Sequence, residues 1–193
     1  GLDLEMPASG RLNTDRIIKA VQSGELSYDK LDACVTRLLA LIIKSRRLLN
    51  DNHQHSANEH HQVAKLAALE ACVLLKNEQQ NLPLSTSDKV GVIGALAKDT
   101  RYQGSGSSQI NPTHLDQPLE AISLLNAGVE YVPGYKLKGA TPKSFIDDAI
   151  ALAENMDNII LIVGLTRECE SEGFDRTHLD LPEGQIALIE ALS

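Results

Sequence analysis

Residues 1–50 carry apolar positions at helical spacing. From Ser27 onward, apolar side chains recur every three or four residues, which is the spacing of one helix face. They are Leu31, Val35, Leu38, Leu39, Ile42 and Ile43. We therefore expect a long helix from Ser27 to about Leu49. A short helix capped by Thr14 and ended by Gly24 should precede it. Gly1 to Met6 alternate like the end of a strand.

Residues 51–60 are polar and show no apolar periodicity, which is typical of a linker. Histidines gather in and beside this segment, as His53, His55, His60 and His61. Such a group of histidines is a candidate metal site. No cysteine accompanies these histidines, and a structural zinc site usually includes one. We expect no bound metal and no cofactor.

From residue 61 onward, helical patterns alternate with short apolar runs. Strands are predicted at Val90–Gly94, Val129–Val132 and Asn158–Gly164. Helices are predicted around Val63–Leu69, at Leu119–Leu125, around Phe145–Leu152 and after Pro182. This alternation predicts the α/β class, with a mostly parallel sheet that helices cover on both faces.

Composition narrows the class of protein. The chain has 193 residues, of which 42% are hydrophobic and 23% charged, as in ordinary globular proteins. A net charge of -8 argues against nucleic acid or an anionic membrane surface as a partner. Three scattered cysteines and the lack of an Asn-X-Ser/Thr site favour a reducing, cytoplasmic compartment. Aromatic residues are only 3%, which counts against a complete sugar-binding cleft within this chain.

The segment Glu170–Arg176 is the first candidate for chemistry. It holds three carboxylates, a glycine and an arginine just after the buried strand predicted to end at Gly164. Ionisable groups on a loop that leaves a rigid strand suit acid/base catalysis. An ordinary charged surface loop is the alternative that spacing alone leaves open.

Two glycine-containing loops suggest other ligands. Val90–Asp99 begins like a dinucleotide-binding unit, but the full G-x-G-x-x-G spacing is absent. Arg101–Ser108 could cradle a phosphate through backbone N–H groups, although no lysine stands at Walker spacing. A tight connection that needs positive φ, or close approach to a neutral sugar, fits this loop equally well.

Five segments in order resemble glycoside hydrolase family 3, in particular its β-glucosidase-like members. They are Gly1–Pro7, Gly24–Leu39, Ala68–Leu84, Gly104–Pro112 and Glu170–Gln185. The resemblance implies that residues 1–50 are the last strand and helices of a (β/α)8 barrel. Residues 51–60 would be a linker, and residues 61–193 a truncated α/β sandwich domain.

The resemblance also implies a reaction. Family members hydrolyse β-linked sugars with retention, using an aspartate nucleophile from the barrel and a glutamate acid/base from the second domain. By its place in the family pattern, Glu170 is the expected acid/base, with Glu172 the runner-up. Tyr102, Ser107 and Ser108 could line the leaving-group subsite; serines replace the aromatic platform that other relatives have there. Asp175 and Arg176 are expected to fix the loop.

The nucleophile segment is expected upstream of Gly1, so we expect this chain alone to be inactive. In the full-length protein the chain would pack against the barrel and form part of a β-glucosidase. The substrate would be a β-linked oligosaccharide or glucoside. A non-catalytic supporting domain is the alternative, and a nucleotide-binding α/β module is a further one.

Overall fold

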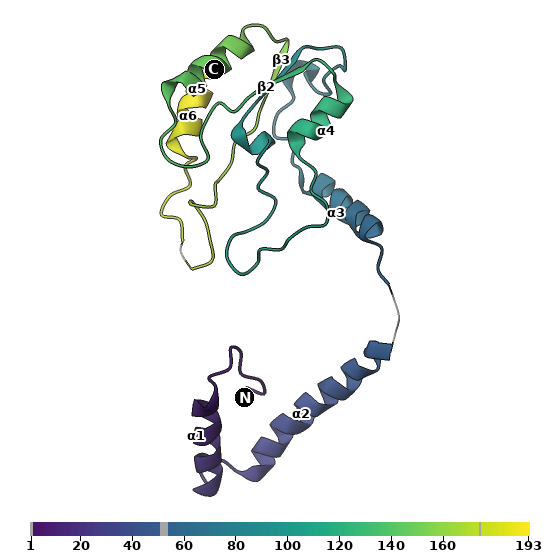
Figure 1. Ribbon diagram of the computed structural model, residues 1–193, viewed down its shortest axis with the longest axis vertical. Helices are drawn as coiled ribbons and strands as arrows, with labels where there is room; N and C mark the ends of the chain where they lie inside the picture. Colours follow the sequence, from purple (N-terminus) through teal and green to yellow (C-terminus); the bar gives the residue numbers. More distant parts are fainter. Residues whose placement is uncertain (1, 51–53, 174) are drawn as a thin grey trace. The chain divides into compact units, whose positions relative to one another are not determined.

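The computed structural model describes residues 2–50, 54–173 and 175–193. The chain forms two compact units, Gly1–His60 and His61–Ser193, and each is described by itself (Figure 1). Among the described residues, no helix combines the length and the apolar character needed to cross a bilayer.

The first unit consists of helices and loops. It contains α1 (Arg11–Gln22), α2 (Tyr28–Arg46) and the short 3-10 helix η1 (Leu48–Asn50). Both predicted helices are present, but Thr14 does not cap α1. The chain enters the helix directly after Gly10, whose φ is 66°. The strand predicted at the start is also wrong: residues 2–6 are irregular, because this unit has no other strand among its described residues to pair with them.

The apolar stripe of α2 is mostly uncovered within this unit. Val35, Leu39, Ile42 and Ile43 are exposed, whereas Leu31 and Leu38 are half-buried. A stripe of this width at helical spacing normally packs against a core. The described residues of the first unit do not supply that core.

The second unit has the alternating order of an α/β protein. Its helices are α3 (Ala57–Ala71), which begins just before the unit does, α4 (Pro118–Leu125), α5 (Lys143–Ala153) and α6 (Glu183–Leu192). The 3-10 helices are η2 (Glu78–Gln80) and η3 (Ala95–Ala97). The strands are β1 (Val90–Ile93), β2 (Val129–Val132) and β3 (Asn158–Leu161). These elements match the predicted ones in kind and order.

The three strands form one parallel sheet in the order β2-β1-β3. Val90 at the start of the central strand is in register with Val129 of β2 and Asn158 of β3. All three strands therefore end at the same edge of the sheet. The α/β class with a parallel sheet is confirmed.

Helices cover the two faces of this sheet. Val90 and Val92 are buried in a cluster that includes apolar residues of α4. Ile93, one residue further along the strand, points to the opposite face and is buried with residues of α5 and α6. Figure 1 shows α5 and α6 together on one side of the strands and α4 on the other.

Two long loops leave the carboxyl edge of the sheet (Figure 1, teal and yellow-green). The Gly-Ser loop (residues 101–108) follows β1, and the acidic loop (residues 170–176) follows β3; Phe174 of the acidic loop lies outside the described residues. Because β1 and β3 are neighbouring parallel strands, the two loops start side by side.

Gln185 of α6 binds the backbone just beyond β3. Its side-chain amide donates to the carbonyl of Gly164 at 2.8 Å and accepts from the N–H of Gly164 at 2.9 Å. The sequence pattern predicts the strand as far as Gly164, but the ladder stops at Leu161, because its partner Ile93 is the last residue of β1. The backbone groups of Gly164 bond to a side chain instead, and the chain turns away towards the acidic loop.

Candidate active site

The Gly-Ser loop and the acidic loop enclose an open hollow of about 580 Å³. Its lining residues are Arg101, Gly104 and Ser105 from one side and Glu170, Ser171, Glu172, Asp175 and Arg176 from the other. Ligands of open parallel sheets bind outside the carboxyl ends of the strands, where this hollow lies. Both glutamates singled out from the sequence therefore reach one site.

Arg101 ties the beginning of the Gly-Ser loop to the acidic loop. Its Nη2 lies 3.3 Å from Oε2 of Glu170. Its Nη1 donates to the carbonyls of Leu165 and Thr166, at 3.3 and 3.5 Å. The Arg101 side chain is only 18% exposed, whereas that of Glu170 is 54% exposed. No role is predicted for Arg101 from the sequence, because it lies 69 residues before Glu170 and no local pattern links the two.

Glu172 is held by the Gly-Ser loop itself. The backbone N–H of Ser107 donates to its Oε2 at 2.6 Å, and the Glu172 N–H reaches the carbonyl of Ser105 at 3.5 Å. Hydrogen bonds from Ser107, first from the side chain and then from the backbone, lower the pKa of Glu172. The carboxylate is thus positioned by backbone rather than by a cation.

Gly106 makes this approach possible. Its φ of 88° belongs to the left-handed region, and a Cβ there would lie 2.6 Å from Cβ of Glu172. Beside it, Ser105 Oγ is buried without a hydrogen-bond partner among the described residues. Any larger residue at position 106 would push the acidic loop away.

Tyr102, Ser107 and Ser108 occupy different parts of the Gly-Ser loop. The Tyr102 hydroxyl donates to the Ile110 carbonyl at 3.3 Å and accepts from Gln103 Nε2 at 2.9 Å. Tyr102 lines a second hollow, of about 680 Å³, that Glu170 also lines. Ser107 contacts Glu172 as described, and the hydroxyl of Ser108 lies beside Gly104. Of the three residues predicted to line the subsite, Ser107 contacts a glutamate directly.

The remaining charged residues near the acidic loop make local contacts. Arg176 Nη2 donates to the carbonyl of Asp180 at 3.2 Å. Glu168 pairs with Lys138 at 2.8 Å, and this hydrogen bond lowers the pKa of Glu168. Asp175 lines the hollow. These contacts leave Glu170, Glu172 and Asp175 as the carboxylates that face the hollow.

The early carboxylates of the first unit are engaged within that unit. Asp3 accepts two hydrogen bonds of 2.6 Å from the guanidinium of Arg37, which hold its pKa well below the usual range. Glu5 accepts hydrogen bonds from Ser9 and Asn13. Both carboxylates therefore have structural partners.

Packing accounts for the glycines of the incomplete dinucleotide pattern. A Cβ at Gly91 would lie 2.7 Å from the Ile159 side chain, and one at Gly94 would lie 2.1 Å from the Ile162 carbonyl oxygen. Both glycines let β3 approach β1 closely. Residues 94–117 are all described and contain one helix, the three-residue η3. This stretch thus lacks the full helix whose N-terminus binds a pyrophosphate.

Comparison with known proteins identifies the family. Residues 72–193 match the family model described as the glycosyl hydrolase family 3 C-terminal domain. The chain therefore belongs to glycosyl hydrolase family 3, and the resemblance seen in the sequence is confirmed.

The relatives are much longer than this chain. Over its whole length the chain is 43% identical to "Thermostable beta-glucosidase B" of Acetivibrio thermocellus and covers 26% of that protein. It is 37% identical to "Exo-alpha-(1->6)-L-arabinopyranosidase" of Bifidobacterium longum and covers 27% of it. The crystal structure of a GH3 beta-glucosidase of Bifidobacterium adolescentis superimposes on the whole chain with a TM-score of 0.91 at 35% identity; the chain covers 28% of it. The chain thus spans about a quarter of the length of these relatives.

Proposed function

We propose that this chain is part of a retaining β-glycosidase and carries the general acid/base carboxyl of its active site. The observation that carries the proposal is the convergence of Glu170 and Glu172 on one hollow beside the Gly-Ser loop. Retaining glycosidases use two carboxyl groups about 5–5.5 Å apart, one as nucleophile and one as acid/base. The aspartate nucleophile would come from a segment upstream of this chain.

The proposed substrate is a terminal, non-reducing β-D-glucosyl residue of an oligosaccharide or glucoside. Relatives bear the names of a beta-glucosidase, an arabinopyranosidase and a xylosidase, which act on different sugars. We put glucose first because the beta-glucosidase shares 43% identity with the whole chain. A subsite formed by Tyr102, Ser107 and Ser108 would receive the leaving group.

The contacts of the two glutamates favour different roles. Family pattern puts Glu170 first as acid/base, yet its carboxylate is paired with the guanidinium of Arg101, a contact suited to anchoring a loop. The described contacts of Glu172 come from the neutral groups of Ser107. They support Glu172 as the acid/base and Glu170 as a positioning residue. Because these hydrogen bonds lower its pKa, the rest of the active site must raise it again, through burial and the charge of the nucleophile.

The domain assignment follows from the same proposal. Residues 1–50 would close a (β/α)8 barrel, residues 51–60 would link the domains, and residues 61–193 would form part of the α/β sandwich. The exposed apolar stripe of α2 supports this assignment, since a barrel would cover it. Without the barrel the isolated chain should not hydrolyse an aryl β-glucoside above the level of its Glu172→Gln variant.

The test compares Glu172→Gln and Glu170→Gln in the longer protein that carries this chain. Turnover is measured with aryl β-glucosides that have good and poor leaving groups. If Glu172 is the acid/base, its variant loses about 10²–10⁴-fold with a poor leaving group. It loses far less with a good one, and added azide restores turnover. The Glu170 variant should show a smaller loss that does not depend on the leaving group.

Glu168→Gln is the matched control, because Glu168 precedes the same loop and pairs with Lys138 outside the hollow. If instead the loss of turnover in Glu170→Gln depends on the leaving group, Glu170 is the acid/base, as the family pattern suggests. If neither variant shows it, the acid/base proposal fails. The second candidate function, a non-catalytic domain that supports the barrel, would then be favoured.

A further inference from the structure

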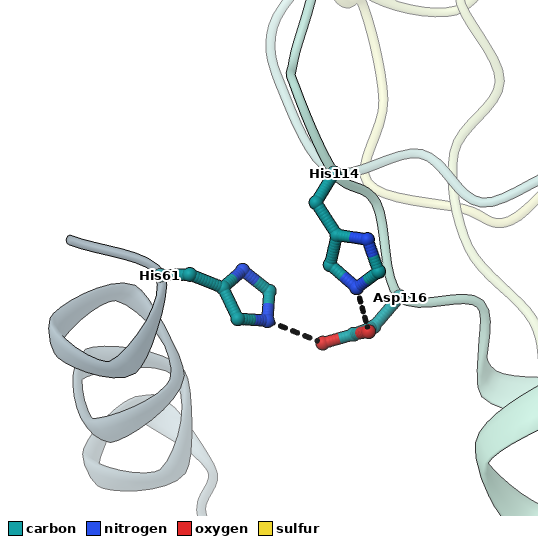
Figure 2. A group of neighbouring side chains, drawn as sticks. All are labelled: His61, His114 and Asp116. Carbon is teal, nitrogen blue, oxygen red and sulfur yellow. Dashed lines mark hydrogen bonds and ion pairs between the residues drawn. The ribbon is translucent and has the colours of Figure 1, made fainter. Parts of the chain in front are cut away.

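Three side chains of kinds that bind metals come together within the second unit. Nε2 of His61, on α3, lies 3.0 Å from Oδ2 of Asp116. Nε2 of His114 lies 2.8 Å from Oδ1 of the same carboxylate. The three ligand atoms lie within 4.8 Å of one another. Figure 2 shows both imidazole rings directed at the one carboxylate, His61 from the helix and His114 from the loop that carries Asp116.

The spacing fits a small tetrahedral ion. Ligand atoms about 2.0–2.1 Å from a tetrahedral zinc ion lie about 3.3 Å from one another. The two nitrogen–oxygen distances, 2.8 and 3.0 Å, are to different oxygens of Asp116, and the three ligand atoms lie within 4.8 Å of one another, so they must move closer together to share one ion. The rings are 4.7 Å apart and nearly perpendicular, at 79°, so their nitrogens reach the carboxylate from different directions. Small side-chain rotations would therefore admit the ion.

The donor set selects the kind of ion. Two imidazole nitrogens and one carboxylate oxygen suit zinc and the neighbouring transition metals. Calcium and magnesium prefer six or more oxygen ligands, which this group does not offer. His114 and Asp116 are exposed and His61 is half-buried, so the ion can enter from solvent and water can be its fourth ligand.

Hydrogen bonding alone is a weaker explanation of the arrangement. Exposed histidine–carboxylate pairs stabilise little, and the side chains of His114 and Asp116 are 61% and 60% exposed. A single divalent ion would instead bind the two imidazole nitrogens and the carboxylate at once.

We propose that His61, His114 and Asp116 bind a divalent transition-metal ion, with water as the fourth ligand. Zn²⁺ is the ion that suits these ligands best. The ion fixes the segment before α4 to helix α3. That segment continues the Gly-Ser loop, so the metal anchors its far end. Sequence reasoning weighed only the histidines near the linker; His114 and Asp116 lie more than fifty residues further along, and only the fold brings them to His61.

The test measures Zn²⁺ binding to the purified 193-residue chain by equilibrium dialysis. Cys34, Cys72 and Cys169 are first replaced by serine, because thiolates bind zinc themselves. We expect one tight site per chain. His114→Ala and Asp116→Asn should each weaken binding at least about tenfold, since loss of even an outer-shell partner costs 10–100-fold.

His178 and Asp180 provide the matched control. They have the same His-x-Asp spacing and lie 3.5 Å apart, but belong to no three-ligand group among the described residues. His178→Ala with Asp180→Asn should leave zinc affinity unchanged. Far-UV circular dichroism verifies that every variant keeps its helices.

Cobalt supplies a second readout. Co²⁺ at the site should show the intense visible absorption of four-coordinate cobalt, and His61→Ala should reduce it to the weak absorption of the aquated ion. Equal zinc affinity in the Asp116→Asn and control variants would overturn the proposal. So would loss of binding in the control alone, or a six-coordinate cobalt spectrum in the parent chain.

Discussion

The backbone N–H of Ser107 donates a 2.6 Å hydrogen bond to the carboxylate of Glu172, 65 residues further along the chain. The contact joins a loop that leaves the central strand to a loop that leaves its neighbour. A carboxylate fixed by a backbone group moves only when that backbone moves. The position of Glu172 therefore depends on the conformation of the Gly-Ser loop.

Ser107→Ala should raise the pKa of Glu172 towards its ordinary value of 4.5, because the Ser107 side chain is the first cause of the lowering. The N–H of residue 107 remains, so part of the lowering should persist. A lowered folded-state pKa stabilises the fold above about pH 4.5, and this stability is lost as the pH falls through the folded pKa. Carbon NMR of the Glu172 carboxyl measures the titration, with Ser108→Ala as control. An unchanged midpoint in Ser107→Ala would contradict the assignment.

Gly106→Ala should destabilise the chain by two separate effects. Left-handed backbone costs a residue with a Cβ about 1–2 kcal/mol. The new Cβ would also collide with Cβ of Glu172, 2.6 Å away. Gly139→Ala is the control, since Gly139 has a φ of 71° but nothing within 4 Å of its Cβ position. Urea denaturation should show the larger loss in Gly106→Ala; equal losses would mean that the contact with Glu172 adds no strain.

Apolar periodicity predicted the second unit well and the first unit less well. Val129–Val132 was predicted with both of its ends, because a short apolar strand between turns has few alternatives. The strand at residues 2–6 failed because pairing needs a neighbouring strand, which no local pattern supplies. The extra length predicted for β3 failed because the neighbouring strand β1 ends at Ile93, the partner of Leu161, and the apolar pattern of β3 does not record where its neighbour ends.

The candidate site was predictable in residue type but not in contacts. An acidic segment after a buried strand pointed to Glu170 and Glu172, and its family pattern pointed to catalysis. The partners that distinguish them, Arg101 and Ser107, lie 69 and 65 residues away along the chain. The strand order decides which loops lie side by side, and glycines allow their atoms to approach closely. The spacing of residues along the sequence reveals neither the strand order nor these contacts.

Gln185→Leu should cost about 2–5 kcal/mol of unfolding free energy, because both backbone groups of Gly164 would lose their partner in a buried place. The side chain is 1% exposed, and leucine has a similar size but cannot form hydrogen bonds. Urea denaturation of the chain measures the loss. Gln109→Leu, on the exposed surface, should change stability little. A similar loss in both variants would mean that apolar substitution itself, rather than the Gly164 contact, is responsible.

Tyr135→Phe should remove a pH dependence as well as stability. The hydroxyl donates to the Ile162 carbonyl at 2.8 Å and accepts from the Leu96 N–H at 3.3 Å, and the residue is 1% exposed. Losing both hydrogen bonds should cost about 1–3 kcal/mol, which urea denaturation at neutral pH measures.

The pH effect follows from burial, which raises the pKa of Tyr135 above its ordinary value of 10. A raised folded-state pKa gives stability that is complete below pH 10 and is lost as the pH rises through the folded pKa. Above about pH 10 the parent chain should therefore lose stability more steeply than Tyr135→Phe. Tyr28→Phe is the control, because Tyr28 is exposed and its replacement should leave the parent slope in place. If Tyr135→Phe keeps the parent slope, the alkaline loss of stability arises elsewhere, and burial of the Tyr135 hydroxyl is not its cause.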